Sequence, residues 1–267
     1  MRSGSACHYS PVAPGRLAAL ALASLIALAA APAAHAQLLI KEDGLWRFGV
    51  GAGLSIASGN SSLKNLNATA DAVRATASNK WTLYGRLLRA EEDDATTTDQ
   101  LSAGVRHDRE LGRQWFHFGT LDWLRDRPAN IAQRGSLNSG LGYHLFKDET
   151  GFWDVFAGVG YSHDQFVNPT VVADEVRSNY GRLEMLLGQG SEHKLSESTR
   201  LKQRLSFFQN LRDADNYRAV FDSTLAVAMG RRFDLTASLN YRYNNDPGTA
   251  LSKGDLLFIT GVLVRLE

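Results

Sequence analysis

The sequence predicts an all-β protein, a transmembrane antiparallel up-and-down β-barrel of about 12 strands, with roughly 10 to 14 compatible with the pattern. Three observations support this fold: an export leader, an alternation of apolar and polar residues, and a contrast between short and long connections. The 267 residues contain 29 basic and 28 acidic side chains. This balance creates no basic field, so we expect no nucleic-acid partner.

Residues 1–36 have the pattern of a secretory signal peptide. Basic residues and no acid come first, an apolar run follows over 17–33, and Ala34-His35-Ala36 ends the segment as an A-x-A cleavage site. We expect cleavage after Ala36 and a single barrel domain over 37–267. The single cysteine, Cys7, would be removed with the leader, so we expect no disulfide in the exported chain.

Alternation with a period of two recurs along the chain. Trp46, Phe48 and Val50 alternate with Arg47 and Gly49, which is the pattern of a strand with one apolar and one polar face. The predicted strands cover residues 45–57, 65–72, 81–88, 100–107, 115–124, 134–145, 152–162, 180–188, 200–208, 217–228, 233–243 and 256–266. In the stretch 115–124 both the even and the odd positions are apolar, so the sequence does not show which of them point into the barrel.

A soluble periplasmic sheet protein also has strands that alternate apolar and polar residues. Strand length and aromatic placement distinguish a membrane barrel from it. The predicted strands approach the length of tilted membrane-spanning strands. Tryptophans open successive odd-numbered strands, and tyrosines cluster at the opposite end, as two membrane-interface girdles would require. The predicted interface aromatics are Trp46, Trp81, Trp115, Trp153, Tyr161, Tyr180, Tyr217, Tyr241 and Tyr243.

The predicted connections between strands alternate between short turns and long loops. Short turns are expected at 75–80, 108–114 and 230–232, and long loops at 89–98, 125–133, 163–179 and 244–254. Short periplasmic turns and long extracellular loops are typical of outer-membrane barrels. We therefore expect a monomer in the outer membrane of a Gram-negative bacterium. Its partners would be outer-membrane lipid, lipopolysaccharide and, during biogenesis, the barrel assembly machinery.

The polar face of the predicted strands carries many charges. The parity of each strand assigns these side chains to the lumen: Arg47, Asp71, Arg86, Arg106, Arg134, Asp154, Arg182, Glu184, Lys202, Arg204, Arg218, Asp222, Asp234 and Arg242. Bases exceed acids by four in this set, which predicts a mild anion preference if a pore is open. The alternative is an ion-paired, closed interior. About 12 strands enclose less space than a porin, so a wide pore is not expected.

Short motifs carry a resemblance to a known family. Residues 123–128, Trp-Leu-Arg-Asp-Arg-Pro, are followed by Arg134 and by Gly140-Leu141-Gly142-Tyr143, and an early Ser58-Gly59-Asn60-Ser61 turn follows a glycine-rich strand. These features resemble uncharacterised outer-membrane β-barrel proteins labelled salt-induced outer membrane protein. The resemblance implies an outer-membrane barrel and supplies no established activity. The final strand ends Val-Arg-Leu-Glu, whereas such barrels usually end on an aromatic residue.

The leading functional hypothesis is a narrow passive channel or an envelope structural protein linked to salt or osmotic conditions, where the salt association comes from the family label alone. The alternative is an outer-membrane lipid or peptide hydrolase with its site at the extracellular rim. Ser162-His163-Asp164 contains the three triad residue types, but neighbouring strand residues point to opposite faces. Asp126 with His163 at the rim is a second candidate pair. We expect no enzyme, no cofactor and no metal site.

A rim motif, Arg125, Asp126 and Arg127, lies where the fifth strand enters its long loop. It would either form an ion pair and turn that fix the loop, or bind lipopolysaccharide phosphates or a small anion through the arginine fork.

Overall fold

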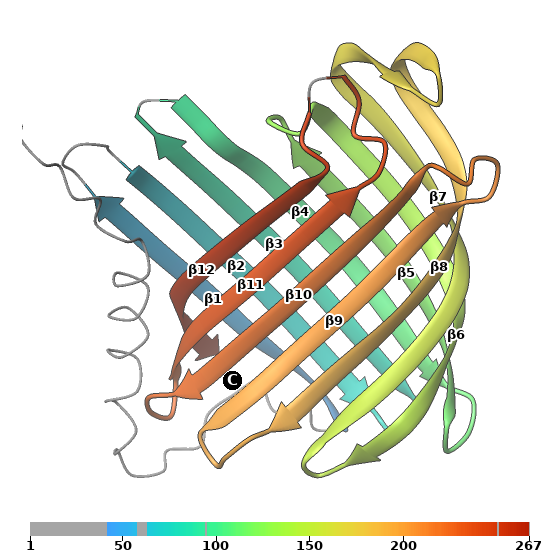
Figure 1. The fold of residues 1–267 in the computed structure, drawn as a ribbon. Helices are drawn as coiled ribbons and strands as arrows, with labels where there is room; N and C mark the ends of the chain where they lie inside the picture. Colours follow the sequence, from blue (N-terminus) through green and yellow to red (C-terminus); the bar gives the residue numbers. More distant parts are fainter. Residues whose placement is uncertain (1–41, 58–62, 94, 250, 267) are drawn as a thin grey trace, which may run out of the picture. The chain divides into compact units, whose positions relative to one another are not determined.

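The computed structural model describes residues 42–57, 63–93, 95–249 and 251–266, and Figure 1 shows them as a barrel. Within these residues, twelve strands form the barrel. The predicted leader and the Ser58-Gly59-Asn60-Ser61 turn lie outside the described residues. The strands are β1 (Asp43–Ala57), β2 (Leu63–Thr76), β3 (Asn79–Glu92), β4 (Ala95–Glu110), β5 (Trp115–Asp126), β6 (Ile131–Asp148), β7 (Gly151–Val172), β8 (Glu175–Lys194), β9 (Thr199–Asn210), β10 (Tyr217–Ala228), β11 (Phe233–Asn244) and β12 (Gly254–Leu266). The predicted all-β fold is confirmed.

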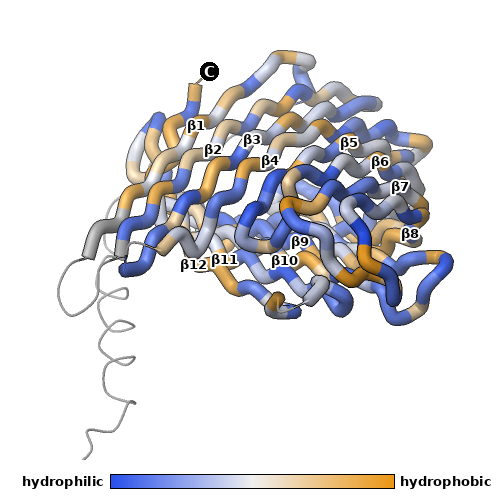
Figure 2. The backbone as a smooth tube through the Cα atoms, turned by 90° about the horizontal axis from the view of Figure 1, so that it is seen from above, coloured by the Kyte–Doolittle hydropathy of each residue, from blue (hydrophilic) through white to orange (hydrophobic). Residues whose placement is uncertain are grey.

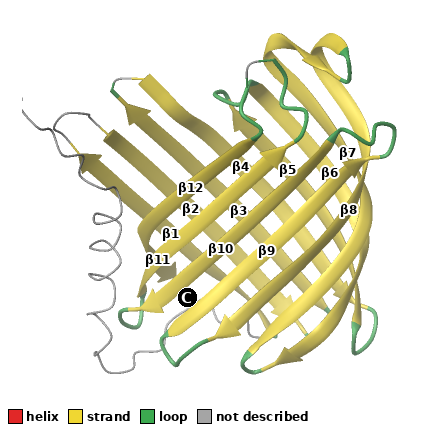
Figure 3. Ribbon diagram, viewed as in Figure 1, coloured by secondary structure: helices red, strands yellow, loops and turns green. Residues whose placement is uncertain are grey.

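Each strand pairs antiparallel with its neighbours in the chain, and β1 closes the barrel against β12. The described residues contain strands and connections only (Figure 3). No helix in the described part of the chain is long and apolar enough to cross a membrane. The closing seam joins Phe48 to Leu266 and Ala52 to Val262 as opposite partners. Closure satisfies the backbone hydrogen bonds of β1 and β12 that an open sheet would leave exposed.

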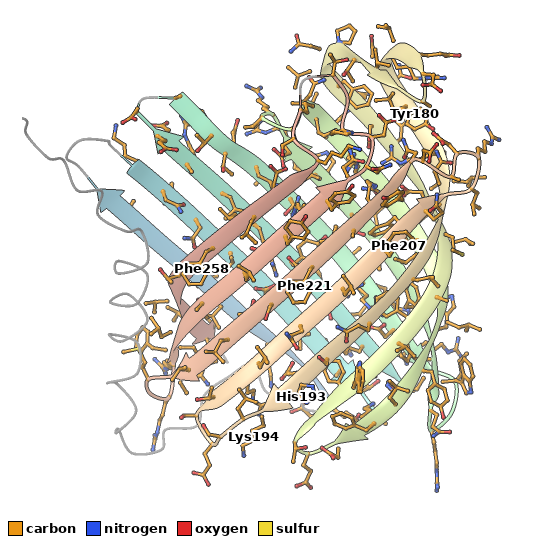
Figure 4. All side chains as sticks on the ribbon, in the orientation of Figure 1. Tyr180, His193, Lys194, Phe207, Phe221 and Phe258 are labelled. Atoms are coloured by element: carbon orange, nitrogen blue, oxygen red, sulfur yellow. The ribbon has the colours of Figure 1, made fainter. Side chains whose placement is uncertain are left out.

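The outer face of the barrel is apolar. Leu54, Leu121 and Leu137 keep 57–68% of their surface exposed although they lie in the middle of paired strands. Figure 2 shows hydrophobic and hydrophilic residues alternating along the strands. Figure 4 shows Phe207, Phe221 and Phe258 on the wall formed by β9 to β12. Leucine and phenylalanine side chains outside a closed sheet are stabilised by lipid tails and not by water.

The segment predicted as a long loop at 163–179 is instead a strand hairpin. β7 continues to Val172 and β8 begins at Glu175, so only Ala173 and Asp174 form the turn. Both turn residues have positive φ, 51° and 61°, which is the backbone of a two-residue hairpin turn. Without the usual Asn-Gly or Asp-Gly pair, the sequence lacks the signal that identifies such a turn.

The facing of β5, open from the sequence, is decided by β6. Phe116 and Phe118 point inward and are 2% and 0% exposed. Their partners across the ladder are Gly142 and Gly140. A Cβ at Gly142 would lie 2.0 Å from the Phe116 ring, so only glycine leaves room for it. The aromatic rings thus occupy space that glycine frees inside the barrel.

Candidate functional site: the barrel lumen

Residues directly opposite each other in an antiparallel ladder share one face, so the register assigns every strand position to the lumen or to the exterior. The charged residues predicted from parity lie on the inner face. Several of them stand directly opposite a polar or oppositely charged residue in the ladder: Asp71 is opposite Tyr84, Arg134 is opposite Asp164, and Arg204 is opposite Asp222. The inner face is therefore densely charged, and its chemistry depends on which charges are paired.

More charges face the lumen than the sequence suggested. The additional bases include Lys80, Lys147, Lys194, Arg200 and Arg265, and the additional acids include Asp108, Glu110, Asp122, Asp126, Asp164, Glu192 and Asp255. Most of these additional charged residues lie just beyond the predicted strand ends. Asp122 lies within 115–124, where the sequence does not show which side chains face inward. The additional acids offset part of the predicted surplus of four bases. Total lumen charge therefore gives less support to an anion preference than the sequence suggested, and the preference stays a prediction that depends on how the bases are arranged locally.

A chain of alternating charges, the ionic cluster, runs across the inner wall of β6, β7, β8 and β10. Its members are Arg134, Asp164, Arg182, Glu184 and Arg218. Arg134 Nη2 and Arg182 Nη1 donate to Asp164 Oδ2 at 2.6 and 2.9 Å. Arg182 Nε donates to Glu184 Oε1 at 2.8 Å, and Arg218 Nη2 donates to both Glu184 oxygens at 2.8 Å. Both acids have side chains only 2% exposed, so the charged groups of this part of the inner wall are buried.

An apolar cluster extends the buried wall toward the end of the barrel where the β4–β5 and β6–β7 turns lie. Phe116, Phe118, Phe156 and Leu186 are buried together on β5, β7 and β8, and Phe208 on β9 packs against them. The rings of Phe118 and Phe156 meet edge to face at 5.4 Å. Interior aromatic packing of this kind narrows the lumen from one side.

Four bases beside the apolar cluster, Lys80, Arg106, Lys202 and Arg204, form what we call the basic cluster. The Arg106 guanidinium lies 4.6 Å from the centre of the Phe118 ring and 5.4 Å from that of Phe156. The Arg204 guanidinium lies 5.1 Å from the same Phe156 ring. The Phe156 ring therefore holds guanidinium groups from two distant strands, β4 and β9, by cation–π contact.

The opposite wall carries small polar side chains. Inner-face positions of β1, β2, β10, β11 and β12 include Gly49, Gly51, Gly53, Thr69, Thr224, Thr236, Ser238 and Gly261. Beside this wall, the side chains of Arg86 and Asp71 stay 43% and 31% exposed, with their charged groups 3.8 Å apart. Solvent therefore reaches the inner face midway along β2 and β3.

The loops at one end of the barrel meet over the ionic cluster. Asp246, in the β11–β12 loop, accepts hydrogen bonds through Oδ2 from the Ala173 backbone at 3.0 Å and from the Asn216 amide at 3.1 Å. The Thr249 backbone also donates to the Thr170 hydroxyl at 3.0 Å. These bonds join three connections: β7–β8, β9–β10 and β11–β12. A small cavity beneath them is lined by residues of these loops and of the ionic cluster.

The predicted girdle aromatics lie outside, with one exception. The tryptophans that open β1, β3, β5 and β7 are 40–53% exposed: Trp46, Trp81, Trp115 and Trp153. Tyr161 and Tyr241 are exposed on the outer face, and the rings of Tyr217 and Tyr243 stack at 5.9 Å.

Tyr180 lies on the inner face and is not an interface residue. It stands opposite Asp164 in the ladder, its hydroxyl accepts a hydrogen bond from Asn210 at 2.8 Å, and its ring lies 5.5 Å from the Arg182 guanidinium. Figure 4 labels it at the end of the barrel where the β7–β8 turn lies. Its residue type predicts an interface position. However, Tyr180 and Arg182 are two positions apart on β8, so their side chains point to the same face, and Arg182 points inward.

The rim motif is divided between the two faces of β5. Arg125 Nη2 donates to Asp99 Oδ1 at 3.1 Å, whereas Asp126, on the inner face, accepts from Gln100 Nε2 at 2.6 Å. The Arg127 backbone donates to the Asp99 carbonyl. These contacts attach the end of β5 and the first residue of its turn to β4, which fits a structural role for the motif.

The structure does not bring the hydrolase candidates together. Ser162 points inward and donates to Glu184 at 2.6 Å, whereas His163 points outward from β7. Asp126 is on the inner face of β5, so it cannot orient His163 either. Among the described residues, no group of three or more His, Cys, Asp or Glu side chains could hold a metal ion.

A closed antiparallel barrel with an apolar exterior and a charged lumen defines a β-barrel protein of the outer-membrane type. Residues 50–265 match the family described as "Protein of unknown function, DUF481", and the chain belongs to this family. It is 24% identical over 199 residues to "Uncharacterized protein YdiY" of Escherichia coli (strain K12), covering 73% of each chain.

Solved barrels show a likeness of fold alone. The translocator domain of autotransporter NalP from Neisseria meningitidis is 14% identical with a TM-score of 0.44, covering 94% of this chain and 95% of that one. The NanC porin is 10% identical with a TM-score of 0.47, covering 83% of this chain and 100% of that one.

Proposed function

We propose that this protein is a narrow passive channel for small hydrophilic solutes. The observation that carries the proposal is the exposure of Arg86 and Asp71, 43% and 31%, on the inner face of a closed barrel. Charged side chains in a barrel lumen are solvated only if water enters it. The adjacent wall includes glycine, serine and threonine, whose short side chains reach less far into the lumen than the arginines of the ionic cluster.

The path would be narrow because only part of the lumen is free. The ionic and apolar clusters fill the wall formed by β5 to β10. The three joined extracellular loops extend over the same wall. A barrel of twelve strands is also narrower than the porins of 16 to 18 strands. We therefore expect a conductance well below that of a general porin.

Two measurements on refolded protein without the leader test the channel. A heat-modifiability gel first establishes that the barrel is folded, and a planar lipid bilayer then records current. Discrete, small conductance steps are expected. If folded protein inserts into the bilayer without any conductance step, the proposed channel is rejected and the structural role remains as the candidate function.

A role as an envelope structural protein is the second candidate, and the ionic cluster is the observation that favours it. A wall joined by buried ion pairs provides rigidity without requiring solute passage. The link to salt or osmotic conditions rests on the family resemblance alone. It is tested by measuring the abundance of the protein in cells grown in low and in raised NaCl, where an unchanged level would remove it.

Location in the outer membrane, with lipopolysaccharide around a monomeric barrel, is part of the same proposal. The exposed apolar exterior and the outer-face tryptophans support it. Membrane fractionation should recover the protein with the outer membrane, and detergent should be needed to dissolve it. Release by osmotic shock would contradict the assignment.

The hydrolase alternative has no assembled site in the described residues. Replacing His163 with Ala should leave any esterase or peptidase activity of the purified barrel unchanged. A loss of hydrolysis in the variant would reopen this alternative.

A further inference from the structure

Most of the charge of the basic cluster has no ion-pair partner among the described residues. Arg106 is paired with Asp108 at 2.7 Å. For Lys80, Lys202 and Arg204, no carboxylate oxygen of the described residues lies within the 4.0 Å of an ion pair. Elsewhere on the inner face, the ionic cluster shows that this barrel pairs bases closely with acids.

The acids around the basic cluster are already engaged elsewhere. Glu192, opposite Lys202 in the ladder, accepts from Arg200 at 3.1 Å. Asp122 accepts from the Tyr84 hydroxyl at 2.5 Å, and Asp222 accepts from the Asn240 amide at 2.6 Å. These bonds hold the carboxylates toward neighbouring strands, so they do not replace an ion pair for Arg204.

Phe156 brings two of the bases together. The guanidiniums of Arg106 and Arg204 lie 5.4 and 5.1 Å from the centre of its ring, although they come from β4 and β9. Phe156 itself is only 6% exposed, so its ring is a fixed support. Like charges held at one ring repel each other, and an anion between or beside them would remove that repulsion.

The cluster is also accessible from the lumen. Lys202 is exposed although it lies on the inner face of β9. Its β10 neighbour on the inner face is Thr224, and the next inner-face position on that strand is Ala226. These short side chains leave the ammonium group open to the water path.

We propose that the basic cluster binds the carboxylate or phosphate group of a small hydrophilic solute and makes the lumen selective for such anions. This inference rests on the proposed channel for the passage of the solute, but binding itself requires only the folded barrel. Guanidinium groups donate paired hydrogen bonds to either oxyanion, and lysine adds a point charge. A neutral solute would gain neither interaction.

The test measures binding and conduction separately on the refolded barrel. Equilibrium dialysis in detergent would use inorganic phosphate and gluconate as two anionic probes and sorbitol as the neutral probe. Planar bilayers would then measure how each probe reduces the potassium chloride current. We expect phosphate or gluconate to bind and to reduce the current, and sorbitol to do neither. The two probes distinguish a phosphate site from a carboxylate site.

The informative variant is Lys202→Gln combined with Arg204→Gln. It should raise the half-saturating anion concentration about tenfold or more, because charge-assisted hydrogen bonds are lost. Arg242→Gln is the control, since Arg242 is an inner-face base on β11, apart from Phe156. It should leave anion affinity unchanged. If the double variant fails to fold on the gel, Lys80→Gln alone provides the same comparison.

Equal binding of sorbitol and the anions, or unchanged anion affinity in the folded variants, would overturn the inference. The two proposals fail separately. Anion binding without conductance would reject the channel and leave the binding site standing. Conductance that no anion alters would reject the binding site and leave the channel standing.

Discussion

Arg218 Nη2 donates to both carboxylate oxygens of Glu184 at 2.8 Å and so joins β10 to β8 across the intervening strand β9. Glu184 also accepts from Arg182 and from the Ser162 hydroxyl. A carboxylate that is 2% exposed with this many donors is the centre of the ionic cluster.

Glu184→Gln should destabilise the folded barrel strongly. Removing one member of a buried ion-pair network leaves arginines uncompensated, at a cost of about 3–5 kcal/mol. Reversible urea unfolding in lipid vesicles would measure the free energy of unfolding. Asp71→Asn is the control, since Asp71 is 31% exposed and 3.8 Å from Arg86, and should cost less than about 1 kcal/mol. Equal losses for the two variants would show that the ionic cluster is not a stabilising element.

Gly142→Ala should destabilise the barrel by roughly 1–3 kcal/mol through overpacking. The added Cβ would lie 2.0 Å from the Phe116 ring, which is buried and cannot move away easily. Gly190→Ala is a matched control, because Gly190 lies on the inner face of β8 and a Cβ there meets no atom within 4 Å. The same unfolding measurement applies. If Gly142→Ala proves as well tolerated as Gly190→Ala, the inward facing of Phe116 is incorrect.

Asp246→Ala should free the extracellular loops and raise the single-channel conductance. The substitution removes the acceptor that the Ala173 backbone and the Asn216 amide share. Asp213→Ala is the control, because its carboxylate accepts from the Asp215 backbone within one loop. Bilayer recordings should show larger or noisier steps for Asp246→Ala only. Identical recordings for both variants would indicate that the joined loops do not restrict the path.

A cysteine pair tests how the barrel closes. Val50 and Val264 are direct partners on β1 and β12, and the one natural cysteine, Cys7, lies in the predicted leader. Val50→Cys with Val264→Cys should therefore crosslink on oxidation and change the mobility of the unheated protein. Val50→Cys with Leu239→Cys on β11 is the control. Preferential crosslinking of the control pair would mean that the closing strand or its register differs.

Much of the barrel was predictable because a β-strand alternates its side chains with a period of two. Trp46 and Arg47 already define the outer and inner faces of β1, and the inward facing of Arg182 and Arg218 follows from the same rule. The strand ends were less predictable. The Ala173-Asp174 turn has no strong sequence signal, so Asp164 was assigned to a loop and omitted from the lumen.

The sequence by itself determined the fold class, the twelve strands and the face of most charged residues, since each depends only on local alternation. The tertiary structure decided which charges meet. Glu184 and Arg218 are 34 residues apart and on strands that are not neighbours, so their contact depends on register and barrel curvature together. The same long-range geometry leaves Lys202 and Arg204 without an ion pair among the described residues, while it pairs Arg182 with two acids. Pairing across a closed sheet is a property of the whole barrel, and no single strand encodes it.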